Sequence, residues 1–168
     1  MGLGQAQNVC LNEFSPLDCP DGATVYGHGG SGWLADLSPI PGATWIWVPY
    51  IAGDVSPAES SVFIVAGSFS IPGTPTGGTL SIAVDDMAVV FVNGSLVGRW
   101  GSVTEVGKAS VADDILKSFD IGPNLVSGLN TLTIKIFNGP AAFAGCAGHC
   151  TYTQNPAGVV FGGSISYE

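Results

Sequence analysis

Residues Gly78 to Gly98 read GTLSIAVDDMAVVFVNGSLVG, and this stretch decides the fold class. Apolar side chains alternate with polar or small ones over residues 79–84, which is the period of a half-buried strand. A second apolar run covers residues 87–92, after Asp85-Asp86 has interrupted the pattern. Asn93-Gly94 follows, a dipeptide typical of a two-residue type I′ turn because both central positions need φ > 0. The stretch therefore predicts three consecutive strands, and the Asn93-Gly94 turn joins the last two as a hairpin.

The segments on either side of this stretch predict further strands. Each has alternating apolar side chains or a short apolar run, and they cover residues 44–48, 61–71, 117–121, 130–137 and 158–167. In the first of them Trp45 and Trp47 share a face, either as core rings or as a platform for a sugar. The polar residues 99–114 remain unassigned. We therefore predict an all-β antiparallel sandwich of about eight strands, with long loops and no helix.

Composition favours a single domain and excludes some partners. A chain of 168 residues with 46% hydrophobic residues can bury one core, and 25 Gly and 11 Pro indicate many turns. The net charge is −9, and four Lys and Arg residues cannot neutralise a run of phosphates, so we expect no nucleic-acid partner. No apolar segment is long enough to predict a membrane span, and the N-terminus does not have the pattern of a signal peptide.

The four cysteines fall into two close pairs near the two ends of the chain. The simplest prediction is two local disulfides, Cys10–Cys19 and Cys146–Cys150. The alternative is a zinc site at Cys146 and Cys150 with His149 or His28, although the spacing of the first pair does not suit zinc. Disulfides imply a location outside the reducing cytosol. We therefore expect an extracellular protein, either an excised secreted domain or a protein of the virion surface.

Catalytic motifs are weak in this sequence. Gly27 to Gly32 matches the glycine spacing of a dinucleotide-binding loop, but no helix pattern follows it. His28 and His149 are the only histidines, and no triad or metal motif accompanies them. Asp113-Asp114, in a polar stretch, are most simply a solvated turn. We therefore predict that the chain is not an enzyme.

The order of several short motifs resembles that of the galactose-binding-like jelly rolls, which are non-catalytic β-sandwiches. These motifs lie at residues 45–47, 63–72, 80–86, 90–94, 119–121, 128–132 and 155–159. The resemblance covers residues 43–168 and implies two antiparallel sheets, with glycan or protein ligands held by loops at one end. Residues 1–42 lie outside it, and we predict that they form an N-terminal arm stapled by a disulfide.

The resemblance also implies a structural calcium, and no other cofactor is predicted. Asp85 and Asp86 lie at a strand junction, and carboxylates are suitable calcium ligands. The alternative is that the two residues cap a turn through hydrogen bonds from their side chains.

Two functions remain, and both are non-catalytic. A structural or interaction protein, such as a phage capsid decoration or tail protein, would dock on protein subunits through its arm and loops, and could form a homo-oligomer. A carbohydrate-binding module would instead use exposed rings, for which the candidates are Trp33, Tyr50, Trp100 and Tyr152. The lack of an export signal favours the structural protein, with the carbohydrate-binding module as the alternative.

Overall fold

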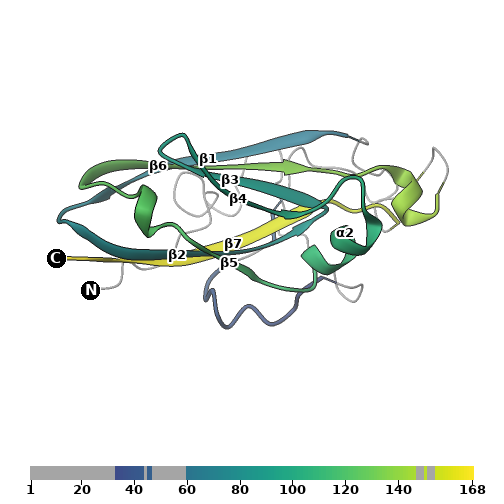
Figure 1. The fold of residues 1–168 in the computed structure, drawn as a ribbon. Coiled ribbons are helices and arrows are strands. Elements are labelled where there is room, and N and C mark those ends of the chain that lie inside the picture. Colours follow the sequence, from purple (N-terminus) through teal and green to yellow (C-terminus); the bar gives the residue numbers. More distant parts are fainter. Residues whose placement is uncertain (1–32, 44, 47–59, 147–149, 151–153) are drawn as a thin grey trace.

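The computed structural model describes residues 33–43, 45–46, 60–146, 150 and 154–168. Two antiparallel sheets face each other as a sandwich (Figure 1), which confirms the predicted fold class. One sheet has the order β1–β6–β3–β4 and the other the order β5–β2–β7. Their bounds are β1 Val62–Ile71, β2 Pro75–Asp85, β3 Met87–Val92, β4 Ser95–Gly101, β5 Lys117–Asp120, β6 Gly128–Phe137 and β7 Gly158–Tyr167.

The hairpin predicted at Asn93-Gly94 is confirmed. Asn93 has φ 50° and Gly94 has φ 77°, as a type I′ turn requires, and Val92 pairs with Ser95 across it. The two strands before the turn, however, belong to different sheets, since β2 pairs with β5 and β7 whereas β3 pairs with β4 and β6. Asp85-Asp86, joined by a cis peptide bond, is the point where the chain crosses between the sheets.

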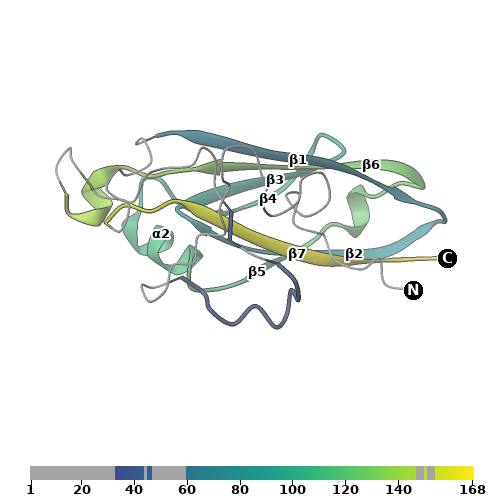
Figure 2. The ribbon, with the colours of Figure 1, turned by 180° about the vertical axis from the view of Figure 1, so that it is seen from behind.

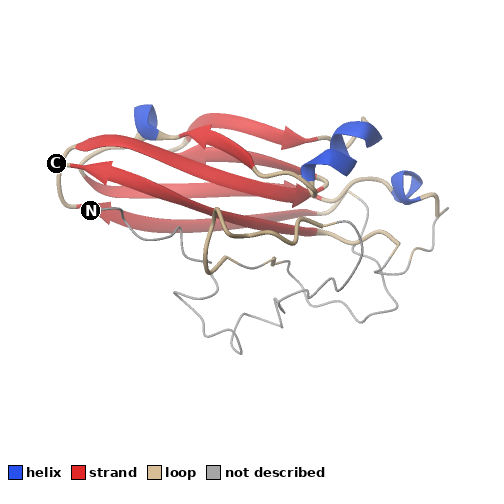
Figure 3. Cartoon of the chain, turned by 90° about the horizontal axis from the view of Figure 1, so that it is seen from below, coloured by secondary structure: helices blue, strands red, loops and turns tan. Residues whose placement is uncertain are grey.

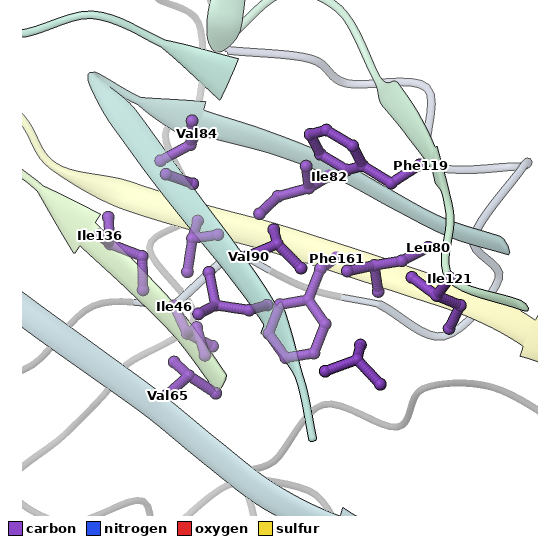
Figure 4. Close-up of a cluster of buried hydrophobic side chains, with 14 of the residues drawn as sticks. Ile46, Val65, Leu80, Ile82, Val84, Val90, Phe119, Ile121, Ile136 and Phe161 are labelled. Carbon is purple, nitrogen blue, oxygen red and sulfur yellow. The ribbon is translucent and has the colours of Figure 1, made fainter. Parts of the chain in front are cut away.

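The main core fills the space between the sheets (Figure 4). The inward positions of the strands supply it, and they recur at every second residue at Leu80, Ile82 and Val84 of β2 and at Ile134 and Ile136 of β6, as the period of two predicts. Its members from those two strands and β3 include Leu80, Ile82, Val84, Val90, Ile134 and Ile136. Ile46 joins them and forms an isolated bridge to Val159, with an N···O distance of 2.9 Å. Ile46 belongs to the strand predicted at residues 44–48, of which the structure describes only residues 45 and 46.

A third layer covers the outer face of the sheet β5–β2–β7. Residues 33–43 run along this face (Figures 2 and 3), and Trp33, Ile40 and Trp45 form a second buried cluster with Ala83 and Val160. Glycines on β7 leave room for the layer, because a Cβ on Gly158 would lie 2.5 Å from the Trp33 ring. The segment 33–43 therefore packs on the sandwich, although sequence placed it in an arm. A domain boundary at residue 42 stays a prediction.

The prediction of no helix is wrong. Helix α2 spans Val106–Ala112, and two short 3₁₀ helices span Gly122–Asn124 (η1) and Ala141–Ala144 (η2). Helix α2 buries Ala109 and Ala112, which are three residues apart, beside β2 and β4. Ser102 Oγ accepts hydrogen bonds from the backbone N–H groups of Thr104 and Glu105 in the turn before the helix, whereas Glu105, at the N-cap, makes no side-chain cap hydrogen bond.

The remaining strand predictions hold with shifted ends. Strand β2 begins four residues before the predicted run, which starts at Thr79, and β4 continues to Gly101, beyond the predicted hairpin. Seven strands, where about eight were predicted, form within the described ranges. Across the same ranges, no helix is long and apolar enough to cross a membrane.

Candidate functional site

A cavity opens at the end of the sandwich that carries α2 and η2 (Figure 1). Its volume is about 240 Å³, and we call it the Asp85 cavity. Five parts of the chain line it: the outer layer, the crossing between β2 and β3, helix α2 with the residue after it, η2, and the segment before β7. The lining residues are Trp33, Asp85, Asp86, Val106, Ala109, Ser110, Asp113, Phe143, Ala144, Gln154, Asn155 and Pro156.

Asp85 ends β2 and is held by the outer layer. The indole Nε1 of Trp33 donates a buried hydrogen bond of 2.8 Å to Asp85 Oδ2. Asp85 is 9% exposed. Burial raises the pKa of its carboxyl well above the usual value, the neighbouring Asp86 raises it further, and the bond from Trp33 opposes both effects. The carboxyl is thus positioned by one neutral donor.

Asp86 begins the crossing into β3. Its Oδ2 accepts a bond of 2.6 Å from the backbone N–H of Gly139. A side chain at residue 139 would obstruct this approach, because a Cβ there would lie 2.8 Å from the same oxygen. Burial raises the pKa of Asp86, while the bond from Gly139 and a hydrogen bond shared with Asp85 lower it. The two adjacent carboxyls therefore form a coupled pair at the base of the cavity.

Asp113 follows the last turn of α2. Its surroundings differ from the solvated turn predicted for Asp113-Asp114. It lines the cavity and is half-buried, whereas Asp114 is exposed. Within the described structure, Asp113 Oδ1 is a buried atom without a hydrogen-bond partner. Burial raises the pKa of Asp113 to about 7, and the charge of Asp114 adds to the effect. Sequence reasoning missed Asp113 because it missed the helix that places it.

The rest of the lining is neutral. Phe143 and Val106 are apolar, whereas Gln154 and Asn155 offer amide groups that both donate and accept hydrogen bonds. None of the lining residues that the structure describes is basic. Phe143 had no signal in the sequence, while Asn155 begins one of the motifs that carried the resemblance.

The disulfide predicted between Cys146 and Cys150 is present, with its sulfurs 1.99 Å apart. Cys146 follows Gly145, the C-cap of η2, and its backbone N–H donates to the carbonyl of Ala141, so the disulfide restrains the wall that carries Phe143. Cys10 and Cys19 lie outside the described residues, and their pairing stays a prediction.

The structure gives calcium at Asp85 and Asp86 little support. Calcium takes six to eight oxygen ligands, but these carboxylates accept hydrogen bonds from the N–H groups of Trp33 and Gly139. Among the described residues, no group of three or more His, Cys, Asp or Glu side chains is placed to hold a metal ion. Structural calcium stays a prediction, and nothing below depends on it.

Of the four rings predicted to bind a ligand, Trp33 lines the Asp85 cavity and Trp100 does not. Trp33 is only 9% exposed, and its ring stacks on Trp45 with centroids 4.4 Å apart, so it is a wall of the cavity and not an exposed platform. Trp100 is half-buried against the main core, and its Nε1 donates to the carbonyl of Ala112. Tyr50 and Tyr152 lie outside the described residues.

Comparisons by sequence find no relative, since no family model and no curated protein matches the chain. Solved structures do match. The α-L-rhamnosidase of Streptomyces avermitilis complexed with L-rhamnose has a TM-score of 0.51 and 22% identity, over 73% of this chain and 10% of that chain. The native α-L-rhamnosidase of Aspergillus terreus has a TM-score of 0.50 and 12% identity, over 70% and 14%. A rhamnosidase of family GH78 from Bacillus sp. GL1 has a TM-score of 0.46 and 27% identity, over 74% and 11%.

The chain thus spans about a tenth to a seventh of the length of these proteins. At such identities the likeness concerns the fold alone. This chain is similar to a β-sandwich part of much longer glycosidases.

Proposed function

We propose that this chain is a non-catalytic carbohydrate-binding module that holds a sugar unit in the Asp85 cavity. The observation that carries the proposal is the meeting of carboxylates, amides and an aromatic ring in one cavity at one end of the sandwich. Sugar hydroxyls donate to carboxylates, and both donate to and accept from amides. The Phe143 ring and the Val106 side chain offer apolar surface to the C–H groups of a pyranose.

The size of the cavity favours a single sugar unit. Pockets for drug-sized ligands usually measure roughly 300–1,000 Å³, whereas this one measures about 240 Å³. We therefore expect it to take a terminal residue of a glycan and not the interior of a chain.

The setting that we propose is a larger extracellular protein that acts on or adheres to glycans. The similar solved structures are rhamnosidases, and the part that matches this chain is a small share of each. The galactose-binding-like resemblance also favours a module within a larger protein. The Cys146–Cys150 disulfide is compatible with this location.

Isothermal titration with simple methyl glycosides, including methyl α-L-rhamnoside and methyl β-D-galactoside, tests the proposal. We expect saturable binding of at least one glycoside, and a loss of roughly tenfold in affinity for Phe143→Ala, which removes the ring from the cavity. Phe91→Ala is the matched control, because Phe91 is also half-buried but lies on β3 and does not line the cavity.

Two outcomes contradict the proposal. In one, no glycoside binds saturably or the control variant loses as much affinity as Phe143→Ala. In the other, the chain hydrolyses a nitrophenyl glycoside and Asp113→Asn abolishes the turnover, in which case the cavity is a catalytic site.

A second candidate function is docking to another protein subunit, of which a second copy of this chain is the simplest. One observation favours it: the outer face of the sheet β1–β6–β3–β4 exposes large apolar side chains. They are Val62, Ile64, Leu96 and Leu129. Sedimentation velocity separates the two functions. Docking is supported if the chain forms a concentration-dependent oligomer that Ile64→Lys disrupts and if the chain binds no sugar. The comparisons lend no support to a virion setting.

A further inference from the structure

We propose that the ligand of the Asp85 cavity is cationic, an amino sugar with a free ammonium group, and that the three carboxylates of the cavity select it over neutral and anionic sugars. This inference rests on the proposed function and deepens it by naming the class of sugar.

The first argument is the charge of the lining. Asp85, Asp86 and Asp113 reach the cavity from two directions, the β2–β3 crossing and the end of α2. The charge of Asp113 acts on Asp85, and that of Asp86 acts on Asp113, so the three carboxyls share one electrostatic environment. Uronic acids and phosphorylated sugars would add like charge to this site and are disfavoured.

The second argument is that the chain's own Lys and Arg side chains are placed elsewhere. The sequence has four of them, and none lines the cavity. Lys108 pairs with Glu105 at 2.6 Å on the exposed side of α2. Lys117 and Lys135 lie over aromatic rings on the sheets, and Arg99 is an exposed residue of β4. Among the described residues no cation therefore balances these carboxyls, and in the proposal the ligand supplies it.

One carboxyl oxygen of the cavity lining can accept a further hydrogen bond. Asp113 Oδ1 is buried, and no donor in the described residues reaches it. An ammonium group carries three N–H donors and no acceptor, which suits a site bounded by carboxylate oxygens. An N-acetyl group replaces two of these donors with a carbonyl and carries no charge. Burial is the main cause of the raised pKa of all three carboxyls, and no positive charge of the chain is among the further causes.

A bare metal cation is the competing occupant. Divalent cations also seek carboxylates, but the described acidic side chains do not converge as a metal site. The experiment therefore includes calcium chloride as a probe in its own right.

The test is calorimetric titration of the intact chain near neutral pH with four probes. They are methyl β-D-glucosaminide, methyl N-acetyl-β-D-glucosaminide, methyl β-D-glucoside and calcium chloride. We expect the glucosaminide to bind at least roughly tenfold more tightly than either neutral glycoside, as a charge-assisted hydrogen bond would give. We also expect added calcium not to displace it.

The variants Asp113→Asn and Asp114→Asn form a matched pair. Each replaces one of two adjacent acidic side chains by an amide, but only Asp113 lines the cavity. We expect Asp113→Asn to lose most of the preference for the glucosaminide and Asp114→Asn to keep it. Asp86→Asn is a second cavity variant in case Asp113→Asn does not fold, because an amide oxygen can still accept from Gly139.

Three results would overturn the inference. Equal affinity for the charged and neutral glycosides would show that the cavity binds sugar without selecting charge, which leaves the proposed function standing. Calcium that saturates the site and excludes the glucosaminide would assign the carboxylates to a metal. Equal loss in the Asp113 and Asp114 variants would attribute the preference to the net charge of the chain.

Discussion

A polar cluster lies at each end of strand β3. One contains Asn93, the residue after the strand, and the other contains Asp86, the residue before it. The two clusters differ in how fully their buried polar groups are hydrogen-bonded. At the Asn93 end, Asn130 is fully buried and its amide makes four hydrogen bonds. Its Oδ1 accepts from Asn93 Nδ2 and the N–H of Val126, and its Nδ2 donates to the carbonyls of Val126 and Gly128. At the Asp86 end, three carboxyls line one cavity, and Asp113 Oδ1 is buried without a hydrogen-bond donor among the described residues.

The difference separates a structural cluster from a binding cluster. A buried amide with all its donors and acceptors paired stabilises one arrangement of the chain. Buried carboxyls with raised pKa values cost stability at neutral pH, and groups of this kind are expected where function requires them. The Asn93 end should therefore respond to mutation through stability, and the Asp86 end through binding.

The largest effect on stability should come from Asn130→Ala. The substitution removes the hydrogen-bond partner of the part-buried backbone groups of Val126 and Gly128 and leaves a cavity at a fully buried position, which should cost about 3 kcal/mol. Urea denaturation measures the change. Asn124→Ala is the control, because Asn93 bonds to the backbone carbonyl of Asn124 and that group survives. If the two variants unfold at the same urea concentration, the amide cluster does not stabilise the fold.

The disulfide at the cavity end should contribute less. Closing the short loop between Cys146 and Cys150 restricts the unfolded chain by about 2 kcal/mol. The double variant Cys146→Ser, Cys150→Ser should lose about this much in a urea melt and should weaken sugar binding through the Phe143 wall. Mass spectrometry of a non-reduced digest checks both predicted pairs, and a Cys19–Cys146 peptide would refute the assignment.

The turn itself should show an effect of similar size. Gly94→Val puts a β-branched residue at φ 77°, which should cost on the order of 1–3 kcal/mol. A Cβ at Gly94 meets no atom within 4 Å, so the cost comes from backbone strain. Gly77→Val is the control, since residue 77 has equally open space and no positive φ. An unchanged midpoint for Gly94→Val would mean that the turn tolerates another geometry.

The smallest effect should be a pH dependence at the Asp86 end. The pKa of Asp113 is about 7 in the folded chain, against 3.8 for the ordinary carboxyl. Between these two values the folded state holds more protons than the unfolded state, so stability should fall as pH rises through this range. Because Asp113 is only half-buried, solvent screening should limit its share to about 1 kcal/mol. Asp113→Asn should flatten this part of the stability profile, whereas an identical slope in that variant would assign the effect to other groups.

The two ends of β3 also differ in what their sequence predicts. The turn at Asn93-Gly94 can be predicted locally, because this dipeptide and the alternating apolar residues on either side of it specify a hairpin. Asp85-Asp86 was found as an interruption of the strands, but its partners lie far away in sequence, at Trp33 and Gly139. No local pattern indicates that β2 and β3 separate into two sheets there.

The sequence also did not indicate that residues 33–43 cover the outer face of the sheet β5–β2–β7. Trp33 was read as exposed because the loop-like composition around it gives no sign of the face that it covers. The evidence for that face lies in β7, where the outward positions Gly158 and Gly162 leave space for Trp33 and Ile40. Glycines at alternate positions of a strand are compatible with such packing but do not name the partner.

An NMR titration of the ¹⁵N-labelled chain with methyl β-D-glucosaminide tests the central claim most directly, because it reads both ends of β3 at once. We expect amide shifts that grow to saturation at Asp85, Asp86, Asp113, Gln154, Asn155 and Ala157, with no change at Asn93 and Asn130. Saturable shifts at the Asn93 end or on the outer face of the sheet β1–β6–β3–β4, with the Asp85 cavity unaffected, would contradict the account.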